Sequence, residues 1–264
     1  MHKFHYMNAC IENSVHVVSG NMSCDLDSTV SSLVYAYYLY TIDENKDVFY
    51  LPLMQIPRKK FHLRLETVHF LDKVGIQQEL LTFYEDISLL DLHTKGKLIL
   101  TLVDYHVLSP SLSDLESDVV KVIDHRPIEK QCCQTIIEPV GSCCTLIAEE
   151  ILKNPNFPFD GIVNVLLYGT ILIDTINMSP EVGKTTDKDR VMVHELEESL
   201  EDMGVERDAL FDDINAAKFD MSGKMLLFYN ILKVQKIIVI DGSLDLLLSG
   251  TKIKYGTLVT MQLF

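Results

Sequence analysis

Two aspartates stand between an apolar run and a long apolar segment near the start of the chain. Residues 15–18 are mostly valine, a composition typical of a strand buried on both faces of a sheet. Glycine and asparagine end this run as turn residues, and the stretch from 28 to 40 predicts a helix. In an open α/β sheet such a connection lies at the carboxyl end of the strand, where ligands bind. Asp25 and Asp27 are therefore candidate site residues, although a turn residue and a helix N-cap explain them equally well at this point.

Each of two further apolar runs is followed directly by an aspartate. Residues 98–103 read Leu-Ile-Leu-Thr-Leu-Val and are followed by Asp104, while the run at 119–123 is followed by Asp124. Strands that alternate with helical patterns indicate βαβ units and a mainly parallel sheet. The predicted fold class is therefore α/β, with a mainly parallel sheet flanked by helices.

Periodicity and turn residues place the remaining elements. We expect strands near 15–19, 48–53, 80–84, 98–103, 119–123, 236–240 and 244–248, and helices near 28–41, 62–74, 143–152, 159–173, 187–203 and 208–217. Residues 86–91 are expected to form a connection. The helix at 159–173 is apolar on most faces and brings Asp174 to its end. Charge density rises over 181–213, which predicts a domain boundary near 179–186.

Composition excludes several classes of protein. The 264 residues carry a net charge of −15, which argues against non-specific binding to nucleic acid or to acidic membranes. No run of about 18 apolar residues predicts a membrane helix, and the first residues lack an apolar signal core, so we expect a cytoplasmic protein. The six cysteines follow no CxxC spacing, which favours reduced thiols over a zinc ribbon.

The acidic positions together predict a metal site. A single aspartate at a strand end is usually a turn or cap residue, but several of them are expected at one edge of the sheet. Packed carboxylates cannot all stay ionised without cations between them. Aspartates with a histidine suit Mn²⁺ or Mg²⁺, and a pair of such ions can activate water and accept the charge of a leaving phosphate.

Four short motifs contain these acidic residues, in the order in which they occur along the chain. They are Gly20-Asn21-x3-Asp25-x-Asp27-Ser28, Val103-Asp104-x-His106, Asp124-His125-Arg126-Pro127 and Ile173-Asp174. These motifs resemble those of the DHH phosphoesterase superfamily. The asparagine of the first motif and the Asp-His-Arg-Pro of the third resemble its prune branch, near the exopolyphosphatases and family II pyrophosphatases. The resemblance covers about residues 15–223.

The resemblance implies a role for each acidic residue. Asp25 would bind one of two divalent ions and Asp27 the other, while Asp104 would bridge both. His125 and Asp174 would complete the second ion's ligands. These ions would be Mn²⁺ or Mg²⁺.

Other positions of the motifs leave alternatives open. Arg126 would grip a phosphate through its guanidinium group, or instead form an ion pair with a ligand carboxylate. His106 would orient substrate or a neighbouring carboxylate, or be a buried histidine with satisfied hydrogen bonds. Tyr105 departs from the histidine that many prune proteins have there. Asn21 stands where pyrophosphatases have histidine, which should weaken the first ion site and favour Mg²⁺. With Lys218 it is a candidate for substrate binding.

The resemblance also implies the activity and the domains. We expect a metal-dependent phosphoanhydride hydrolase for short polyphosphate or pyrophosphate, in which a metal-activated water attacks. The alternatives are a phosphodiesterase for cyclic or short nucleotides and a low-activity regulatory protein with protein partners. Residues 1–180 would form the DHH-type domain, and 187–264 a smaller, incomplete α+β second domain similar to DHHA2 domains. A C-terminally shortened form with a reduced substrate clamp and slow turnover is expected.

Overall fold

The computed structural model describes two compact units of the chain. Its described residues are 13–44, 48–129, 133–155, 157–158, 161–219, 238–240, 243–248 and 251–254. The first unit comprises residues 1–218 and the second 219–264. Each unit is described by itself.

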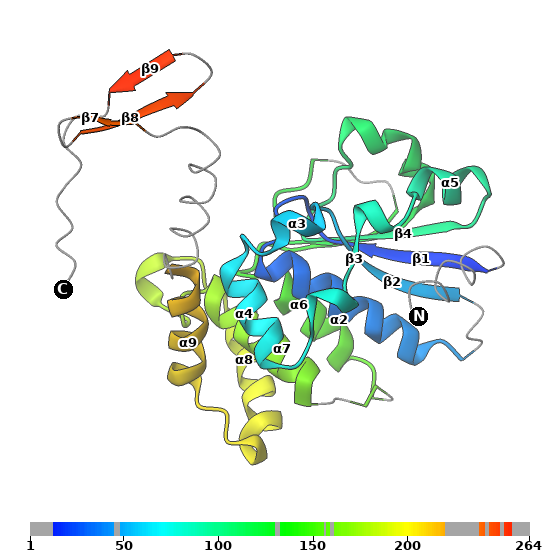
Figure 1. The fold of residues 1–264 in the computed structure, drawn as a ribbon. Coiled ribbons are helices and arrows are strands. Elements are labelled where there is room, and N and C mark those ends of the chain that lie inside the picture. Colours follow the sequence, from blue (N-terminus) through cyan, green and yellow to red (C-terminus); the bar gives the residue numbers. More distant parts are fainter. Residues whose placement is uncertain are drawn as a thin grey trace. The chain divides into compact units, whose positions relative to one another are not determined.

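A six-stranded parallel sheet forms the centre of the first unit (Figure 1). The order is β3-β2-β1-β4-β5-β6, and every neighbouring pair is parallel. The chain moves outward from β1 in one direction and then returns to place β4 on its other side, so the topology changes direction between β1 and β4, where α/β sheets bind ligands. The predicted α/β class is confirmed. The strands are β1 (Ser14–Ser19), β2 (Val48–Met54), β3 (Thr82–Phe83), β4 (Leu98–Val103), β5 (Val119–Asp124) and β6 (Gln134–Ile137).

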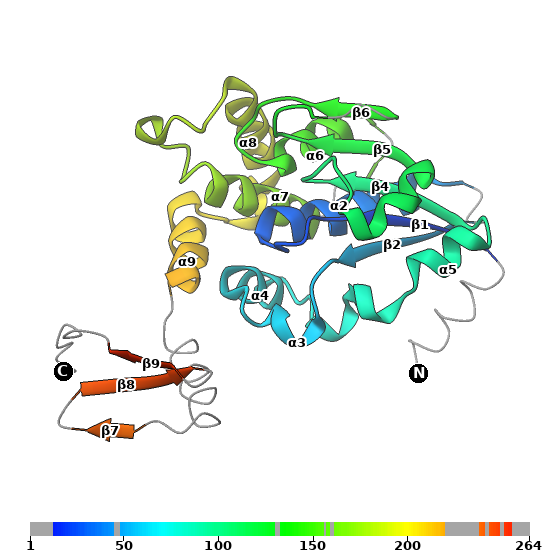
Figure 2. The same ribbon diagram turned by 90° about the horizontal axis from the view of Figure 1, so that it is seen from above.

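Helices cover both faces of this sheet, with α2, α6 and α7 on one face and α5 on the other (Figures 1 and 2). Two hydrophobic clusters correspond to the two faces. The helices are α2 (Leu26–Ile42), α3 (Arg58–Phe61), α4 (Leu65–Lys73), α5 (Leu89–Thr94), α6 (Cys143–Leu152), α7 (Gly161–Asp174), α8 (Asp187–Leu200) and α9 (Arg207–Phe219). Short 3-10 turns span Gln78–Leu80, Tyr84–Asp86, Pro110–Asp118, Pro180–Val182 and Glu201–Met203.

The central strand β1 shows why an apolar β-branched run belongs in a parallel sheet. Val15 and Val17 are fully buried in one cluster, and Val18 is fully buried in the other. Alternate side chains of a strand point to opposite faces, so both layers need apolar residues here. Each buried valine stabilises the fold by about 1.5–3 kcal/mol.

Two predictions for the segment between β2 and β4 need correction. The strand expected at 80–84 pairs with β2 only through Thr82 and Phe83, because 3-10 turns flank these two residues. The connection expected at 86–91 leads directly into α5, whose first turn is capped by the Ser88 hydroxyl accepting from Asp91 N at 3.2 Å. A serine cap before a leucine-rich segment is sufficient to start this short helix.

Helices α8 and α9 belong to the first compact unit. Helix α8 contacts α6 and α7, and it begins at a capping box in which Thr186 and Asp189 bond each other's backbone. The compact units therefore divide the chain between 218 and 219, later than the expected boundary near 179–186. The assignment of 1–180 and 187–264 to DHH-type and DHHA2-like domains stays a prediction.

The second unit contains an antiparallel sheet of the order β7-β8-β9. Its strands are β7 (Ile238–Ile240), β8 (Ser243–Leu248) and β9 (Thr251–Lys254). The first two correspond to the strands expected near 236–240 and 244–248, and β9 was not expected. Among the described residues of the chain, no helix is long and apolar enough to cross a membrane.

Candidate metal centre

Asp25 and Asp27 lie at the junction between β1 and α2. Asp25 is the N-cap of α2, and its Oδ1 accepts a hydrogen bond from Ser28 N at 3.1 Å. Asp27 lies in the first turn and is almost fully buried. Its two carboxylate oxygens accept from Cys143 N at 2.7 Å and Cys144 N at 2.9 Å, the first residues of α6. The N-terminus of a helix is a favourable place for a carboxylate, so these two hydrogen bonds fix Asp27 in position.

The third acid, Asp104, follows β4 in a left-handed backbone conformation with φ of 61°. Aspartate tolerates this region better than most residues, and such conformations concentrate at functional sites. Its buried carboxylate accepts from Asn21 Nδ2 at 2.6 Å on Oδ2 and from Arg126 Nη1 at 2.7 Å on Oδ1. Oδ1 also has the His125 ring as a neighbour, whereas Oδ2 keeps a second lone pair that can face a metal ion.

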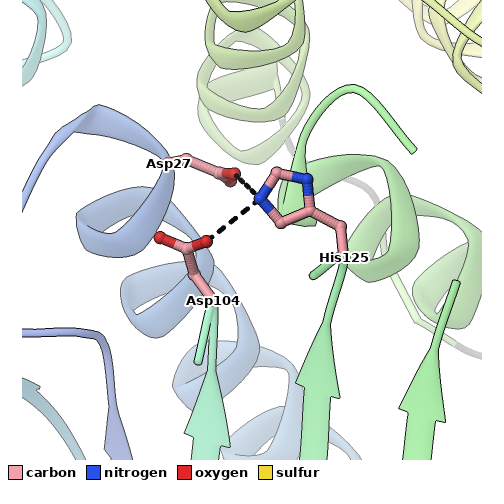
Figure 3. Close-up of side chains that lie close together, drawn as sticks. All are labelled: Asp27, Asp104 and His125. Carbon is pink, nitrogen blue, oxygen red and sulfur yellow. Dashed lines mark ion pairs between the residues drawn. The ribbon is translucent and has the colours of Figure 1, made fainter. Parts of the chain in front are cut away.

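His125 follows β5 and points its Nε2 atom at both buried acids (Figure 3). Nε2 lies 3.2 Å from Asp104 Oδ1 and 3.8 Å from Asp27 Oδ2. The other ring nitrogen, Nδ1, is 2.9 Å from the carbonyl oxygen of Val140, which can only accept, so Nδ1 carries the hydrogen. A histidine oriented in this way by a backbone carbonyl is the usual arrangement of a metal ligand.

Asp174 supplies an observation that points to a cation site. It ends α7, and its Oδ2 is buried with no hydrogen-bond partner among the described residues. Burial, followed by the charge of Asp27, raises the pKa of Asp174 well above its usual value, while a hydrogen bond from the Ser142 side chain opposes the shift. A buried carboxylate oxygen without a donor is costly unless a cation meets it.

The pKa values of neighbouring residues lead to the same conclusion as the unpartnered oxygen of Asp174. We call Asp25, Asp27, Asp104, Asp174 and His125 the acidic centre. Burial and the charge of Asp27 raise the pKa of Asp104 to about 7. Burial alone lowers the pKa of His125, but the hydrogen bond to Asp104 and the charge of Asp27 outweigh it and raise this pKa to about 9. Ligand atoms of Asp27, Asp104 and His125 all lie within 4.8 Å of one another, so one ion can reach all three. The donor set, oxygen with one imidazole nitrogen, fits a hard divalent cation.

Comparisons with known proteins agree with this fold and these motifs. Exopolyphosphatase PRUNE1 of Mus musculus and of Homo sapiens are each 45% identical to the chain over 212 residues, which is 79% of this chain and 46% of each relative. The resemblance to the prune branch of the DHH phosphoesterase superfamily is thereby confirmed. It spans about half the length of these curated relatives. No family model matches it.

Two solved structures have a similar fold. A candidate family II inorganic pyrophosphatase from Methanococcus jannaschii is 25% identical with a TM-score of 0.58, and the match covers 90% of this chain and 69% of that one. An exopolyphosphatase-related protein from Bacteroides fragilis is 16% identical with a TM-score of 0.57, and the match covers 90% and 66%. The second likeness concerns the fold alone.

Arg126 and His106 of the prune-like motifs both contact carboxylates. Arg126 Nη1 donates to the carbonyl oxygen of Asp104, to Asp104 Oδ1 at 2.7 Å and to Asp124 Oδ1 at 3.1 Å. His106 is buried; its Nδ1 lies 2.5 Å from Asp124 Oδ2, and its Nε2 accepts from Glu129 N at 3.0 Å. Both nitrogens of His106 are therefore occupied, which corresponds to the alternative of a buried histidine that orients a carboxylate.

The remaining predicted residues lie at different distances from this chemistry. Asn21 belongs to the centre's surroundings through its hydrogen bond to Asp104. Tyr105 packs away from it, and its hydroxyl is 2.5 Å from Gln55 Nε2. Lys218 is exposed in the last turn of α9, and no described hydrogen bond or ion pair joins it to the acidic centre.

Asp189 is a residue that sequence reasoning missed. It is fully buried and accepts hydrogen bonds from Gly141 N at 2.9 Å, Thr145 Oγ1 at 2.6 Å and Thr186 N at 2.7 Å. Gly141 lies between the carbonyl that orients His125 and the serine next to Asp174. A Cβ at Gly141 would lie 2.5 Å from a methyl group of Thr175, so only glycine fits. The Thr-x-x-Asp spacing before α8 indicates a helix start, but not that Asp189 also reaches this loop.

Proposed function

We propose that this chain hydrolyses phosphoanhydride bonds of short polyphosphates or pyrophosphate with the help of two divalent ions, Mn²⁺ or Mg²⁺. The observation that carries the proposal is the convergence of Asp27, Asp104 and His125 at the carboxyl ends of β1, β4 and β5, next to the unpartnered oxygen of Asp174. The names of the relatives, exopolyphosphatase and family II inorganic pyrophosphatase, support the same chemistry.

The five residues of the acidic centre would hold the ions. Asp25 would serve one ion, Asp27 the other, and Asp104 both, with His125 and Asp174 beside the second. Bound ions of this kind supply Lewis-acid polarisation of phosphoryl oxygens and lower the pKa of water. The chain's own residues orient these ligands: the start of α6 holds Asp27, and the carbonyl oxygen of Val140 holds His125.

Arg126 is the residue proposed to contact substrate. Its side chain is 45% exposed, and the described contacts use only Nη1, so the rest of the guanidinium fork is available to a phosphate oxygen. An arginine cannot exchange protons near neutrality, so its part is to bind charge that develops on phosphate. His106 acts as a positioning residue, since it holds Asp124, which in turn accepts from Arg126 and from His125 N.

Substrate contacts of Asn21 and Lys218 and a slow, regulatory role with protein partners remain predictions of the motifs. We place the protein in the cytoplasm, which the free, buried thiols of Cys24, Cys143 and Cys144 support.

Phosphate release from tripolyphosphate tests the proposal. The purified chain should release phosphate with Mg²⁺ or Mn²⁺ and stop when a chelator removes the ion. Asp25→Asn is the informative variant, because asparagine caps a helix about as well as aspartate but lacks the charge. Release that continues with chelator, or that is unchanged in this variant, would contradict the proposal. Cleavage of a cyclic nucleotide in place of tripolyphosphate would favour the phosphodiesterase alternative.

A further inference from the structure

A second polar site lies between α8, the start of α9 and the turn that follows α7. It is a cavity of about 240 Å³. A water molecule occupies about 30 Å³ of liquid volume, so the cavity holds a small anion with some of its hydration. Three of its six lining side chains are basic, in a chain whose net charge is −15. We call it the basic cavity, and its lining residues are Met178, Arg190, Val193, His194, Glu197 and Arg207.

One face of α8 forms much of this lining. Arg190, His194 and Glu197 are spaced by four and three residues, so their side chains lie along the same side of the helix. Arg207 comes from the first turn of α9 and faces them across the cavity. Basic groups from two helices therefore approach one volume.

Arg207 is held in a fixed orientation. Its Nε donates to Asn177 Oδ1 at 2.8 Å, and its Nη1 lies 3.6 Å from Glu197 Oε1. The turn that carries Asn177 has positive φ angles of 52°, 52° and 61° at three successive residues, Ile176 to Met178. A guanidinium group fixed in this way loses little side-chain entropy when it binds a further anion.

Arg190 has only a weak described partner. Its Nε lies 3.9 Å from Asp187 Oδ1, and the Asp187 side chain is fully exposed, so the pair contributes little. No described contact engages the two terminal nitrogens of Arg190. His194 is similar, since its Nε2 lies 3.4 Å from Glu198 Oε1 in an exposed pair.

Glu197 is the acid of the lining, and its charge is already engaged. Its Oε1 accepts from the Tyr168 hydroxyl at 2.6 Å and faces Arg207. The positive charges of Arg190 and Arg207 thus exceed the one negative charge inside the cavity. Planar guanidinium groups bind phosphate oxygens in bidentate fashion more readily than they bind most other ligands.

We infer that the basic cavity binds a phosphate group through Arg190 and Arg207, with His194 beside it, at a site separate from the acidic centre. The choice of phosphate over other anions rests on the proposed function, because that reaction releases orthophosphate. The same chemistry fits the end of a polyphosphate chain.

Calorimetric titration of the intact chain, freed of metal ions on a chelating resin, tests this site without any turnover. Orthophosphate and tripolyphosphate are titrated separately, and the tighter ligand identifies product or chain end as the source. Arg190→Gln should weaken binding at least tenfold. Lys184→Gln, which removes an exposed charge outside the cavity lining, and Asp104→Asn in the acidic centre should leave it within twofold.

Equal binding by wild type and Arg190→Gln, or no binding by wild type, would overturn the inference. Loss of binding in Asp104→Asn would do the same, because phosphate would then occupy the acidic centre. Since no metal ion and no hydrolysis are involved, failure of this experiment is distinct from failure of the proposed function.

Discussion

The acidic centre has an excess of negative side chains, and the basic cavity has an excess of positive ones. The end of α7 connects the two sites along the chain. Helix α7 ends with Asp174 in the acidic centre, and Met178, four residues later, lines the basic cavity. In the centre, the carboxylates of Asp27 and Asp104 converge on the His125 ring, and a buried oxygen of Asp174 has no donor among the described residues. In the cavity, two arginines face one glutamate that already has partners.

This difference shows how one domain can bind ligands of both signs. The acidic centre needs cations before it can attract a phosphate, because carboxylates otherwise repel the substrate. The basic cavity needs no ion and should bind an anion directly. Each site can therefore be changed without the other, which makes the comparison testable.

The largest expected effect comes from charge removal inside the acidic centre. Asp25→Asn and Asp27→Asn should each lower hydrolysis by about a thousandfold, since positioned charge stabilisation commonly contributes a hundred- to a thousandfold per group. Only Asp27→Asn should also lower the free energy of unfolding, by about 1–3 kcal/mol, because an amide cannot accept from both Cys143 N and Cys144 N. Steady-state rates measure the loss of hydrolysis, and denaturant unfolding curves measure the change in the free energy of unfolding. Similar unfolding curves for the two variants would show that α6 does not hold Asp27.

A smaller effect is expected from substitution of Asp189, which is not one of the proposed metal-binding residues. Asp189→Asn should weaken Mn²⁺ binding by about ten- to a hundredfold, because the amide offers one acceptor oxygen in place of two to the donors around the loop that orients His125. Asp187→Asn is the matched control, since Asp187 lies in the same helical turn with a fully exposed side chain. Mn²⁺ affinities come from calorimetry on each protein. If both variants bind Mn²⁺ equally well, Asp189 has no positioning role.

Arg126→Gln should change two quantities in opposite directions. Losing a cation from the acidic centre should strengthen divalent-ion binding, whereas the KM for tripolyphosphate should rise about tenfold because a charge-assisted hydrogen bond is lost. Kinetics at saturating metal and a separate ion titration distinguish the two. An unchanged KM would mean that Arg126 serves only as an ion-pair partner of Asp104 and Asp124.

Much of this architecture was predictable from local sequence. The runs at 15–18, 98–103 and 119–123 each became a strand of the parallel sheet, since strands with helices on both faces are mostly apolar. Asp104 and His125 could be placed because each directly follows a strand, and Asp25 because it lies in the connection between β1 and α2.

What the sequence did not reveal depends on contacts between distant segments. Asp189 looks like an ordinary capping residue, and its bond to Gly141 exists only because α8 packs beside α6. His106 resembled a site residue, but its two nitrogens are occupied by Asp124 and Glu129 N. The basic cavity also escapes sequence reasoning, because Arg190 and Arg207 belong to different helices and line one cavity only in the folded chain, where Asn177 holds Arg207. Spacing along the chain does not reveal such contacts.

Divalent-ion binding tests the central claim most directly. Mn²⁺ is added to wild type and to Asp104→Asn, and melting temperature is followed alongside calorimetry. Binding to the folded state alone raises stability by about 2.7 kcal/mol at an ion concentration one hundred times Kd. We predict two ions bound by wild type with a clear rise in melting temperature, and no such rise in Asp104→Asn. No binding by wild type, or equal shifts in both proteins, would contradict a metal centre built around Asp104.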